Sequence, residues 1–329
     1  MFDIITFGSA TRDNFLKLKK ENHQIIESNK FVTDKGLCFS LGSKIAIENL
    51  VISTGGGGTN TAATFALQGL KTAYMGKLGR DKRGEAVIED LKKLGIDTSF
   101  IKKDNRLSTS YSVIISSGPG RATILVYRGA CSFLTKQEIP FRKLKARWFY
   151  LAPLNGKLIE SFGSLVDYAK QNKIKVMANL GKEQINLAKT RLKPILAEIN
   201  ILNLNQEEAS LLTGIPFKQE EKLFSKLDKM IEGIAIMTKG KDGVVVSDGK
   251  YMWSASSLSV PLIDVTGAGD AFGSGFLSGM IKTNDISFAI KLGTANSASC
   301  IQEIGAKNGL LKGTRTKYLR QIKVKKVKL

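Results

Sequence analysis

The strongest constraint on the fold is an alternation of short apolar runs with longer amphipathic runs, which begins near residue 58. Runs such as ARWFYLAP, KIKVMANLG and GIAIMTKG have the length of buried strands. Helical stretches separate them; TNTAATFALQGL, for example, places Ala62, Phe65, Ala66 and Gly69 on one helical face. Buried strands that alternate with helices predict an α/β fold with a doubly wound, mostly parallel sheet.

Two stretches break this alternation. Residues 24–53 contain short β-like runs without a helix, and residues 108–128 have the pattern of a hairpin that turns at SGPGR. We expect roughly residues 13–53 and 108–128 to pair into a small sheet, inserted in a single domain over residues 1–329. Such a sheet could cover a cleft as a lid, or form a homodimer surface.

The C-terminal segment QIKVKKVKL alternates apolar residues with lysine. Lysine on an exposed strand discourages pairing with a further strand. This pattern therefore predicts an edge strand guarded by charge.

The composition argues against several classes of protein. The chain is 43% hydrophobic and 24% charged, as in ordinary soluble domains, and has no run of eighteen apolar residues that could cross a membrane. The start, MFDIITFGSATRDNF, lacks the pattern of a secretory signal. Three distant cysteines, Cys38, Cys131 and Cys300, argue against disulfides and a zinc site and suit the cytoplasm. His23 is the only histidine, so histidine chemistry is not expected.

The net charge of +21 could indicate a nucleic acid or an anionic substrate as partner. The lysines, however, are spread along the whole chain. The sequence shows no zinc-finger or RNP-type motif and no interleaving of aromatic and basic residues. A lysine-rich solvated surface is therefore favoured over a nucleic-acid surface.

Four stretches carry candidates for chemistry, and the first is STGGGGTNTA, residues 53–62. Its glycines allow the backbone to approach a ligand closely, and Asn60 offers an amide at the start of a helix. The run matches neither the dinucleotide fingerprint nor the P-loop. A dinucleotide-dependent enzyme is therefore not favoured.

The second stretch is NLNQEEASLLTG, in which Asn205 and Glu208 share one face of a helical first turn. An amide and a carboxylate suit the hydration shell of Mg²⁺. The same spacing equally predicts a capping box, with Asn205 as the N-cap.

The third stretch is MTKGKDGVVV, where Thr238 and Gly240 end a buried strand in a tight turn. Doubly wound sheets hold ligands beyond the carboxyl ends of their strands. A plain hairpin turn is the structural alternative.

The fourth stretch is DVTGAGDAFGSG, residues 264–275. Gly267, Ala268 and Gly269 would present N–H groups at a helix N-terminus, which suits an anion. Asp270 follows where its carboxylate could reach a hydroxyl beside that anion. A simple N-cap would explain Asp270, but not the glycines around it.

Together these stretches suit phosphoryl transfer, which requires positioning, charge neutralisation and one base. The helix N-terminus and Mg²⁺ would take the charge of the transferred phosphate, and Asp270 would take the proton of the acceptor hydroxyl. The second class considered is a non-catalytic protein that binds a small molecule or nucleic acid. Such a protein need not keep Asp270, Glu208 and the glycine loops together.

The same residues resemble a known family. GGGGTNTA followed by MGKLGRDKRGE resembles the N-terminal signature of the ribokinase (PfkB) carbohydrate kinases, and DVTGAGDAFGSGF resembles their C-terminal signature. NQEEASLLTG resembles the N-x-x-E element and TKGKDGV the nucleotide loop. The motifs occur in family order over nearly the whole chain. The resemblance implies a three-layer α/β/α fold with a β lid, and an ATP-dependent kinase that phosphorylates a primary hydroxyl of a sugar or, alternatively, an adenosine-type nucleoside.

The resemblance also implies roles for individual residues. It makes Asp270 the catalytic base and makes an anion hole of Gly267, Ala268 and Gly269. Four residues would serve the Mg²⁺-nucleotide, with Glu208 reaching Mg²⁺ through water: Asn205, Glu208, Thr238 and Gly240. Four would line the acceptor site: Asp13, Gly56, Gly57 and Asn60. A monovalent cation such as K⁺ would lie at Asp264 and Thr266.

Two departures from the family pattern concern the acceptor. Gly57 stands where ribose and fructose kinases often carry a lysine or another side chain, and Ala152 and Pro153 stand where ribokinase has an acidic residue. A glycine-lined, less polar site would fit a nucleoside. An acidic or phosphorylated sugar could use Arg128 or Lys157, although either could simply be solvated.

Overall fold

The computed structural model describes residues 1–31, 34–118, 121–187 and 189–329. Within these residues a nine-stranded sheet has the order β17-β16-β15-β14-β13-β12-β11-β1-β6. Its strands are β1 (Phe2–Phe7), β6 (Thr72–Met75), β11 (Ala146–Leu151), β12 (Lys175–Asn179), β13 (Ile201–Asn205), β14 (Ile234–Thr238), β15 (Val244–Ser247), β16 (Tyr251–Ala255) and β17 (Val324–Lys328). Neighbours from β6 to β14 are parallel, and those from β14 to β17 are antiparallel. The predicted α/β fold is confirmed, and so is the C-terminal edge strand.

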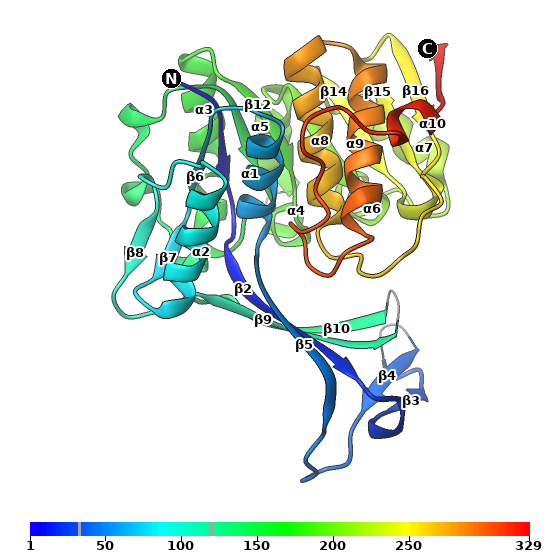
Figure 1. The fold of residues 1–329 in the computed structure, drawn as a ribbon. Coiled ribbons are helices and arrows are strands. Elements are labelled where there is room, and N and C mark those ends of the chain that lie inside the picture. The colour runs from blue at the N-terminus through cyan, green and yellow to red at the C-terminus, as the bar shows by residue number, and fades with distance from the viewer. Residues whose placement is uncertain (32–33, 119–120, 188) are drawn as a thin grey trace.

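Helices cover both faces of this sheet (Figure 1). Successive side chains of β11 point to opposite faces, so Tyr150 joins one apolar cluster and Phe149 the other. The Tyr150 face carries α1 (Gly57–Leu67), α8 (Ala268–Thr283) and α9 (Ile286–Cys300), with α10 (Tyr318–Gln321) beside α9. The Phe149 face carries α3 (Phe162–Gln171), α4 (Lys182–Leu187), α5 (Lys189–Ala197), α6 (Gln206–Thr213) and α7 (Glu220–Asp228).

A third apolar cluster lies under α2 (Lys82–Lys93), where Tyr74 and Leu78 meet Val87 and Leu91. Short 3₁₀ turns occur at Lys20–Asn22, Gly129–Phe133, Lys136–Glu138, Phe141–Lys143, Gly156–Ser161 and Gly240–Asp242. Within the described residues, no helix has both the length and the apolar character needed to cross a membrane.

The short apolar run KTAYMGKLG, residues 71–79, does not form a single strand. Its first half is β6, at the edge of the main sheet, whereas its second half is β7 (Lys77–Gly79), which pairs with β8 (Lys102–Asp104). Gly76 separates the two halves, and a Cβ at this position would overlap the hydroxyl of Tyr74. The Tyr74 side chain occupies the space that a side chain at residue 76 would need, and the hydrophobic periodicity gives no signal of this contact.

The two stretches that break the alternation join the same small sheet, on either side of the strand Thr11–Leu18. The small sheet has the order β10-β9-β2-β5, in which β2 pairs with β9 in parallel and with β5 in antiparallel orientation. Its strands are β2 (Thr11–Leu18), β5 (Ile47–Gly55), β9 (Ser110–Gly118) and β10 (Arg121–Tyr127). A further hairpin, β3 (Gln24–Glu27) with β4 (Lys35–Cys38), lies at its far end (Figure 1). The expected SGPGR turn includes residues 119–120, which lie outside the described residues.

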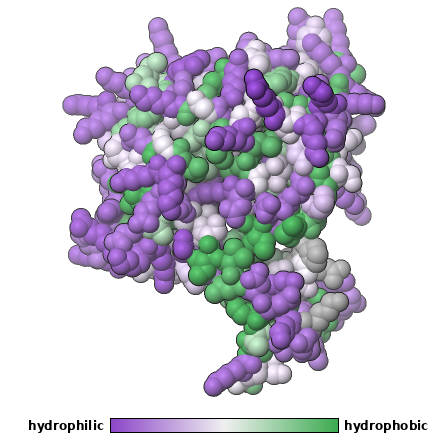
Figure 2. All heavy atoms as spheres, viewed as in Figure 1, coloured by the Kyte–Doolittle hydropathy of each residue, from purple (hydrophilic) through white to green (hydrophobic). Residues whose placement is uncertain are grey.

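The small sheet exposes many large apolar side chains (Figure 2). On β5 and β10 these are Leu50, Ile52, Ile124, Leu125, Val126 and Tyr127. Consecutive residues of a strand point to opposite faces, so Ile124 to Tyr127 expose apolar side chains on both faces of the small sheet.

The glycines of α8 bring this helix close to α9. A Cβ at Gly275 would lie 3.0 Å from the Cα of Gly293, and one at Gly279 would lie 2.6 Å from the Cα of Ala289. Glycine in a helix costs about 1 kcal/mol relative to alanine. The close contact between the two helices offsets that cost and keeps the N-terminus of α8 near the sheet.

We expect Gly279→Ala to destabilise the protein by about 1–3 kcal/mol, because the added methyl group would meet the backbone of α9. The control is Gly163→Ala on α3, whose Cβ would lie 3.4 Å from the flexible end of Ile195. Thermal unfolding should show a lower Tm for the first variant and an unchanged or higher Tm for the second. Equal shifts in Tm would contradict the packing argument.

Candidate functional site

A cleft of about 230 Å³ lies between the carboxyl ends of β12–β14 and the N-terminus of α8. Ligands of doubly wound sheets bind on this side. The cleft is lined by Pro153, Asn179, Asn203, Asn205, Glu208, Thr238, Val265, Gly267, Ala268, Gly269 and Asp270. Residues from three of the four candidate stretches therefore meet in one place.

The remaining stretch, STGGGGTNTA, joins the cleft through a hydrogen bond between side chains. Asn60, in the first turn of α1, donates from Nδ2 to Oδ2 of Asp270 over 2.8 Å. A Cβ at Gly57 would lie 3.4 Å from the other carboxylate oxygen of Asp270 and 3.2 Å from the Cβ of Ala152. Burial raises the pKa of Asp270, and the bond from Asn60 partly opposes this rise. A carboxylate with a raised pKa in a cleft is a suitable general base.

The loop before Asp270 opens helix α8. Gly267 has φ 81°, and a Cβ there would overlap Ala306, so both conformation and space require glycine. The N–H of Ala268 donates to the carbonyl of Val265 over 3.2 Å. The N–H groups of Gly269 and Asp270 stand in the first helical turn, where no intrahelical acceptor exists. These two N–H groups can bind an anion in the cleft.

Asn205 and Glu208 form the capping box that the sequence allowed. The N–H of Glu208 donates to Oδ1 of Asn205, and the N–H of Asn205 donates to Oε2 of Glu208, both over 2.9 Å. Both residues also line the cleft. Burial raises the pKa of Glu208 to about 7. Asn205 and Glu208 therefore cap helix α6 and line the cleft at the same time.

Thr238 lies at the end of β14 and lines the cleft, whereas Gly240 starts the 3₁₀ turn that leads to β15. The strands on either side of this turn are antiparallel. The plain hairpin connection is therefore present, and it brings Thr238, but not Gly240, to the cleft lining.

Asp13 lies on β2 of the small sheet and is 6% exposed. It accepts a hydrogen bond from the hydroxyl of Thr11 over 2.7 Å and packs against Gly55, where a Cβ would overlap its carboxylate. Burial raises the pKa of Asp13. At Gly56, φ is 94° and a Cβ would lie 2.6 Å from the carbonyl oxygen of Ser9, so the loop there also requires glycine.

Lys307 is a charged neighbour of this region that the sequence did not single out. Its ammonium donates to the hydroxyl of Thr54 over 2.9 Å, and that hydroxyl donates to Asp90 of α2 over 2.9 Å. Burial lowers the pKa of Lys307 to about 8, and the carboxylates of Asp90 and Asp13 oppose this shift. No motif surrounds Lys307, so the sequence carries no signal for it.

Two residues that line the cleft, Asn179 and Asn203, were also not predicted as site residues, although both stand near strand ends.

Asp264 and Thr266 belong to a hydrogen-bonded loop. Oδ1 of Asp264 accepts from the N–H and the hydroxyl of Thr266, over 3.0 and 2.7 Å, and Oδ2 accepts from the N–H of Gly305 over 2.9 Å. This carboxylate therefore ties the loop before α8 to the segment after α9. In the part of the chain that the structure describes, no three His, Cys, Asp or Glu side chains are grouped as a metal site.

The two basic residues considered for an anionic acceptor have local partners. Arg128 lies 4.0 Å from Glu183 in an exposed ion pair, and the ammonium of Lys157 lies 5.8 Å from the centre of the Phe133 ring. Neither residue lines the 230 Å³ cleft.

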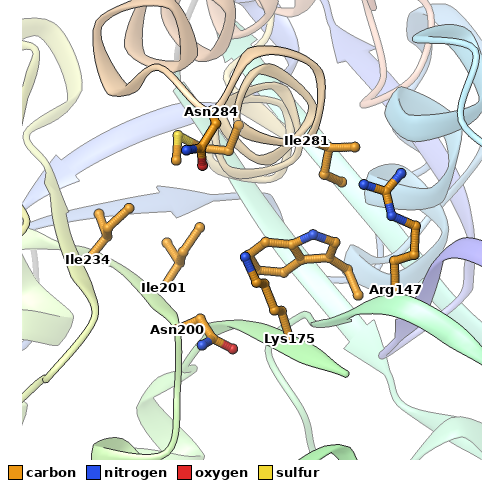
Figure 3. Close-up of a pocket in the computed structure, with 9 residues that line it drawn as sticks. Arg147, Lys175, Asn200, Ile201, Ile234, Ile281 and Asn284 are labelled. Carbon is orange, nitrogen blue, oxygen red and sulfur yellow. The ribbon is translucent and has the colours of Figure 1, made fainter. Parts of the chain in front are cut away.

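A second cavity of about 280 Å³ lies at the opposite edge of the sheet, near the amino ends of β11–β14 (Figure 3). Its floor is apolar, with Ile201, Ile234 and Ile281, and Arg147 and Lys175 stand at its rim. Arg147 already contacts Asp3 over 3.3 Å. This cavity contains none of the candidate residues, so the cleft at α8 remains the candidate active site.

Comparison with known proteins agrees with this fold. The sequence profile of the pfkB family carbohydrate kinases matches residues 3–312, so the chain belongs to this family. It is 28% identical to the ribokinase of Haemophilus influenzae over 281 residues, covering 82% of this chain and 88% of that protein. It is 26% identical to the adenosine kinase of Saccharomyces cerevisiae, covering 87% and 88% of the two chains. The structure of Arabidopsis thaliana ribokinase complexed with ribose and ATP has the same fold, with a TM-score of 0.75 at 21% identity over 94% and 96% of the two chains.

We expect Glu208 to make stability depend on pH. Its pKa is about 7 in the folded protein against a reference of 4.5, so the folded state binds more protons between these values and stability falls as pH rises through this window. Glu208→Gln keeps a capping-box side chain but cannot ionise. Denaturant unfolding from pH 4.5 to 8 should therefore show a flatter pH dependence for the variant. Parallel curves for the two proteins would contradict the raised pKa.

Proposed function

We propose that this protein transfers the γ-phosphate of ATP to a primary hydroxyl of a sugar, at the cleft between the carboxyl ends of β12–β14 and the N-terminus of α8. The observation that carries the proposal is the hydrogen bond from Asn60 to Asp270. It joins the glycine loop, where an acceptor would lie, to the carboxylate that would act as base.

The chemistry would follow from the residues around Asp270. Its carboxylate would take the proton of the acceptor hydroxyl as that oxygen attacks the γ-phosphorus. The raised pKa favours this transfer, because a stronger base accepts a proton more readily. The N–H groups of Gly269 and Asp270, with the loop from Gly267 through Ala268, would stabilise the negative charge on the transferred phosphate.

Asn205, Glu208, Thr238 and Gly240 would hold the Mg²⁺-nucleotide. One carboxylate beside a cleft suits Mg²⁺, which keeps several of its waters, and Glu208 would act through such a water. When bound, Mg²⁺ neutralises charge on the phosphates. Asp264 and Thr266 would lie beside a monovalent cation such as K⁺, close to the loop that starts α8.

Asp13, Gly56, Gly57 and Asn60 would line the acceptor site. A buried carboxylate such as Asp13 suits recognition of sugar hydroxyls, because it accepts hydrogen bonds. A nucleoside is the second candidate acceptor. Gly57 favours it, since this position carries no side chain and faces Ala152 and Pro153, which leaves an apolar wall.

The small sheet would act as a lid over the acceptor. Its exposed apolar strands β5 and β10 also fit a homodimer contact through this lid. The free cysteines Cys38, Cys131 and Cys300 are compatible with a cytoplasmic location. The dispersed basic charge gives no support to a nucleic-acid partner.

Asp270→Asn should lower kcat by about 10²–10⁴, because the amide cannot take the acceptor proton. ATP binding, measured by calorimetry, should be retained. The matched control is Asp285→Asn at the N-cap of α9, where asparagine caps equally well. An Asp270→Asn enzyme within tenfold of the wild-type kcat would show that Asp270 is not the base.

The acceptor should emerge from coupled ADP formation with Mg²⁺ and ATP, measured with and without K⁺. The panel comprises ribose, fructose, fructose phosphates, 2-keto-3-deoxygluconate, adenosine, inosine, guanosine and cytidine. We expect turnover with a sugar. Turnover with nucleosides alone would favour the second candidate acceptor, a nucleoside, instead. ATP hydrolysis that no acceptor changes would contradict the kinase proposal.

A further inference from the structure

Gly273 stands one helical turn after Asp270, on the same face of α8. A Cβ at Gly273 would overlap the hydroxyl of Tyr150 and lie 3.0 Å from Nδ2 of Asn203. Tyr150 belongs to β11, in the centre of the main sheet, and is fully buried. Its hydroxyl therefore occupies space that exists only because residue 273 is glycine.

This hydroxyl is chemically unusual. Among the described residues, the hydroxyl of Tyr150 and Oδ1 of Asn203 are buried side-chain atoms without a hydrogen-bond partner. An unpaired buried polar group is destabilising. Phenylalanine would fill the same apolar cluster without this disadvantage, so stability does not account for the hydroxyl.

The charged neighbour of Tyr150 is Asp270. Burial and the negative charge of Asp270 together raise the pKa of Tyr150 well above its usual value, so the phenol stays protonated and remains a donor. The other elements packed around Asp270 contribute Asn60 from α1, which donates to it, and Cys300 from α9, whose pKa is raised to about 12. Both Tyr150 and Cys300 are therefore neutral near pH 7, and the Tyr150 hydroxyl, which has no acceptor among the described residues, is free to turn its O–H toward the negative charge of Asp270.

We propose that Tyr150 is a positioning residue for phosphoryl transfer. Its hydroxyl packs against Gly273 and sets the distance between helix α8 and strand β11, and the dipole of its O–H group points toward Asp270. A neutral donor favours the ionised form of a nearby carboxylate. Tyr150 thereby opposes the effect of burial and keeps Asp270 able to accept a proton. This inference rests on the proposed role of Asp270 as the base.

The first test is Tyr150→Phe, assayed with the acceptor that the wild type uses. We expect kcat at pH 7 to fall by about 3–10-fold and the acidic limb of the kcat–pH profile to move up by about 0.5–1 pH unit. The KM for ATP should stay unchanged. Tyr168→Phe, on the opposite face of the sheet, is the control and should leave the profile in place. An unchanged acidic limb in Tyr150→Phe would overturn the electrostatic part of the proposal.

The second test needs no turnover. Gly273→Ala should lower Tm by about 2–8 °C, because its methyl group meets the tyrosine hydroxyl. The same change in the Tyr150→Phe background should cost less than half as much, since the overlapping oxygen is gone. Equal losses of Tm in both backgrounds would overturn the role of the hydroxyl in seating α8.

The two tests separate this inference from the proposed function. If the wild-type protein phosphorylated no acceptor, that result would contradict the proposed function and also the catalytic part of this inference. Normal wild-type turnover, combined with an unchanged Tyr150→Phe profile and no rescue of Gly273→Ala, would overturn this inference alone.

Discussion

The hydrogen bond between Asn60 and Asp270 is the interaction on which the site depends. It requires two helices, far apart in sequence, to begin at the same point above the sheet. Positive φ angles at Gly56 and Gly267 open these two helices, and Gly57 lets them approach without a side chain between them. A side chain at Gly56 or Gly267 would strain the backbone and overlap neighbouring atoms.

Burial shifts several ionisable groups of this region. It raises the pKa of Asp270 and brings that of Glu208 to about 7, whereas it lowers that of Lys307 to about 8. Partial removal of water disfavours the charged form of each group. Such clusters of shifted groups are typical of functional sites, since proton transfer near neutral pH needs groups that change charge there. The same cleft walls that hold the nucleotide phosphates in our proposal therefore also tune the base.

The acceptor site that we propose is connected to the rest of the molecule through the small sheet. Strand β2 follows β1 after a short turn and carries Asp13, so the main sheet directly positions this carboxylate. On the neighbouring strand β5, the hydroxyl of Thr54 links Lys307, which follows α9, to Asp90 of α2. The base of the small sheet is therefore held from both ends of the chain, while its far end extends away from the body (Figure 1).

The sequence by itself determined the α/β class, the pairs of loops and helices that carry the candidate residues, and the charged edge strand. These features depend on local periodicity and on the conformations that glycine allows, both of which can be read within a few residues. Tertiary structure decided the break at Gly76, the approach of Lys307 to Thr54, and the packing of Tyr150 against Gly273. The last two of these contacts join residues far apart in the sequence, and the break at Gly76 depends on how the Tyr74 side chain packs rather than on periodicity. The glycines of α8 combine the two: their density was visible in the sequence, but only the packed sheet and α9 explain why residues 273, 275 and 279 are glycine.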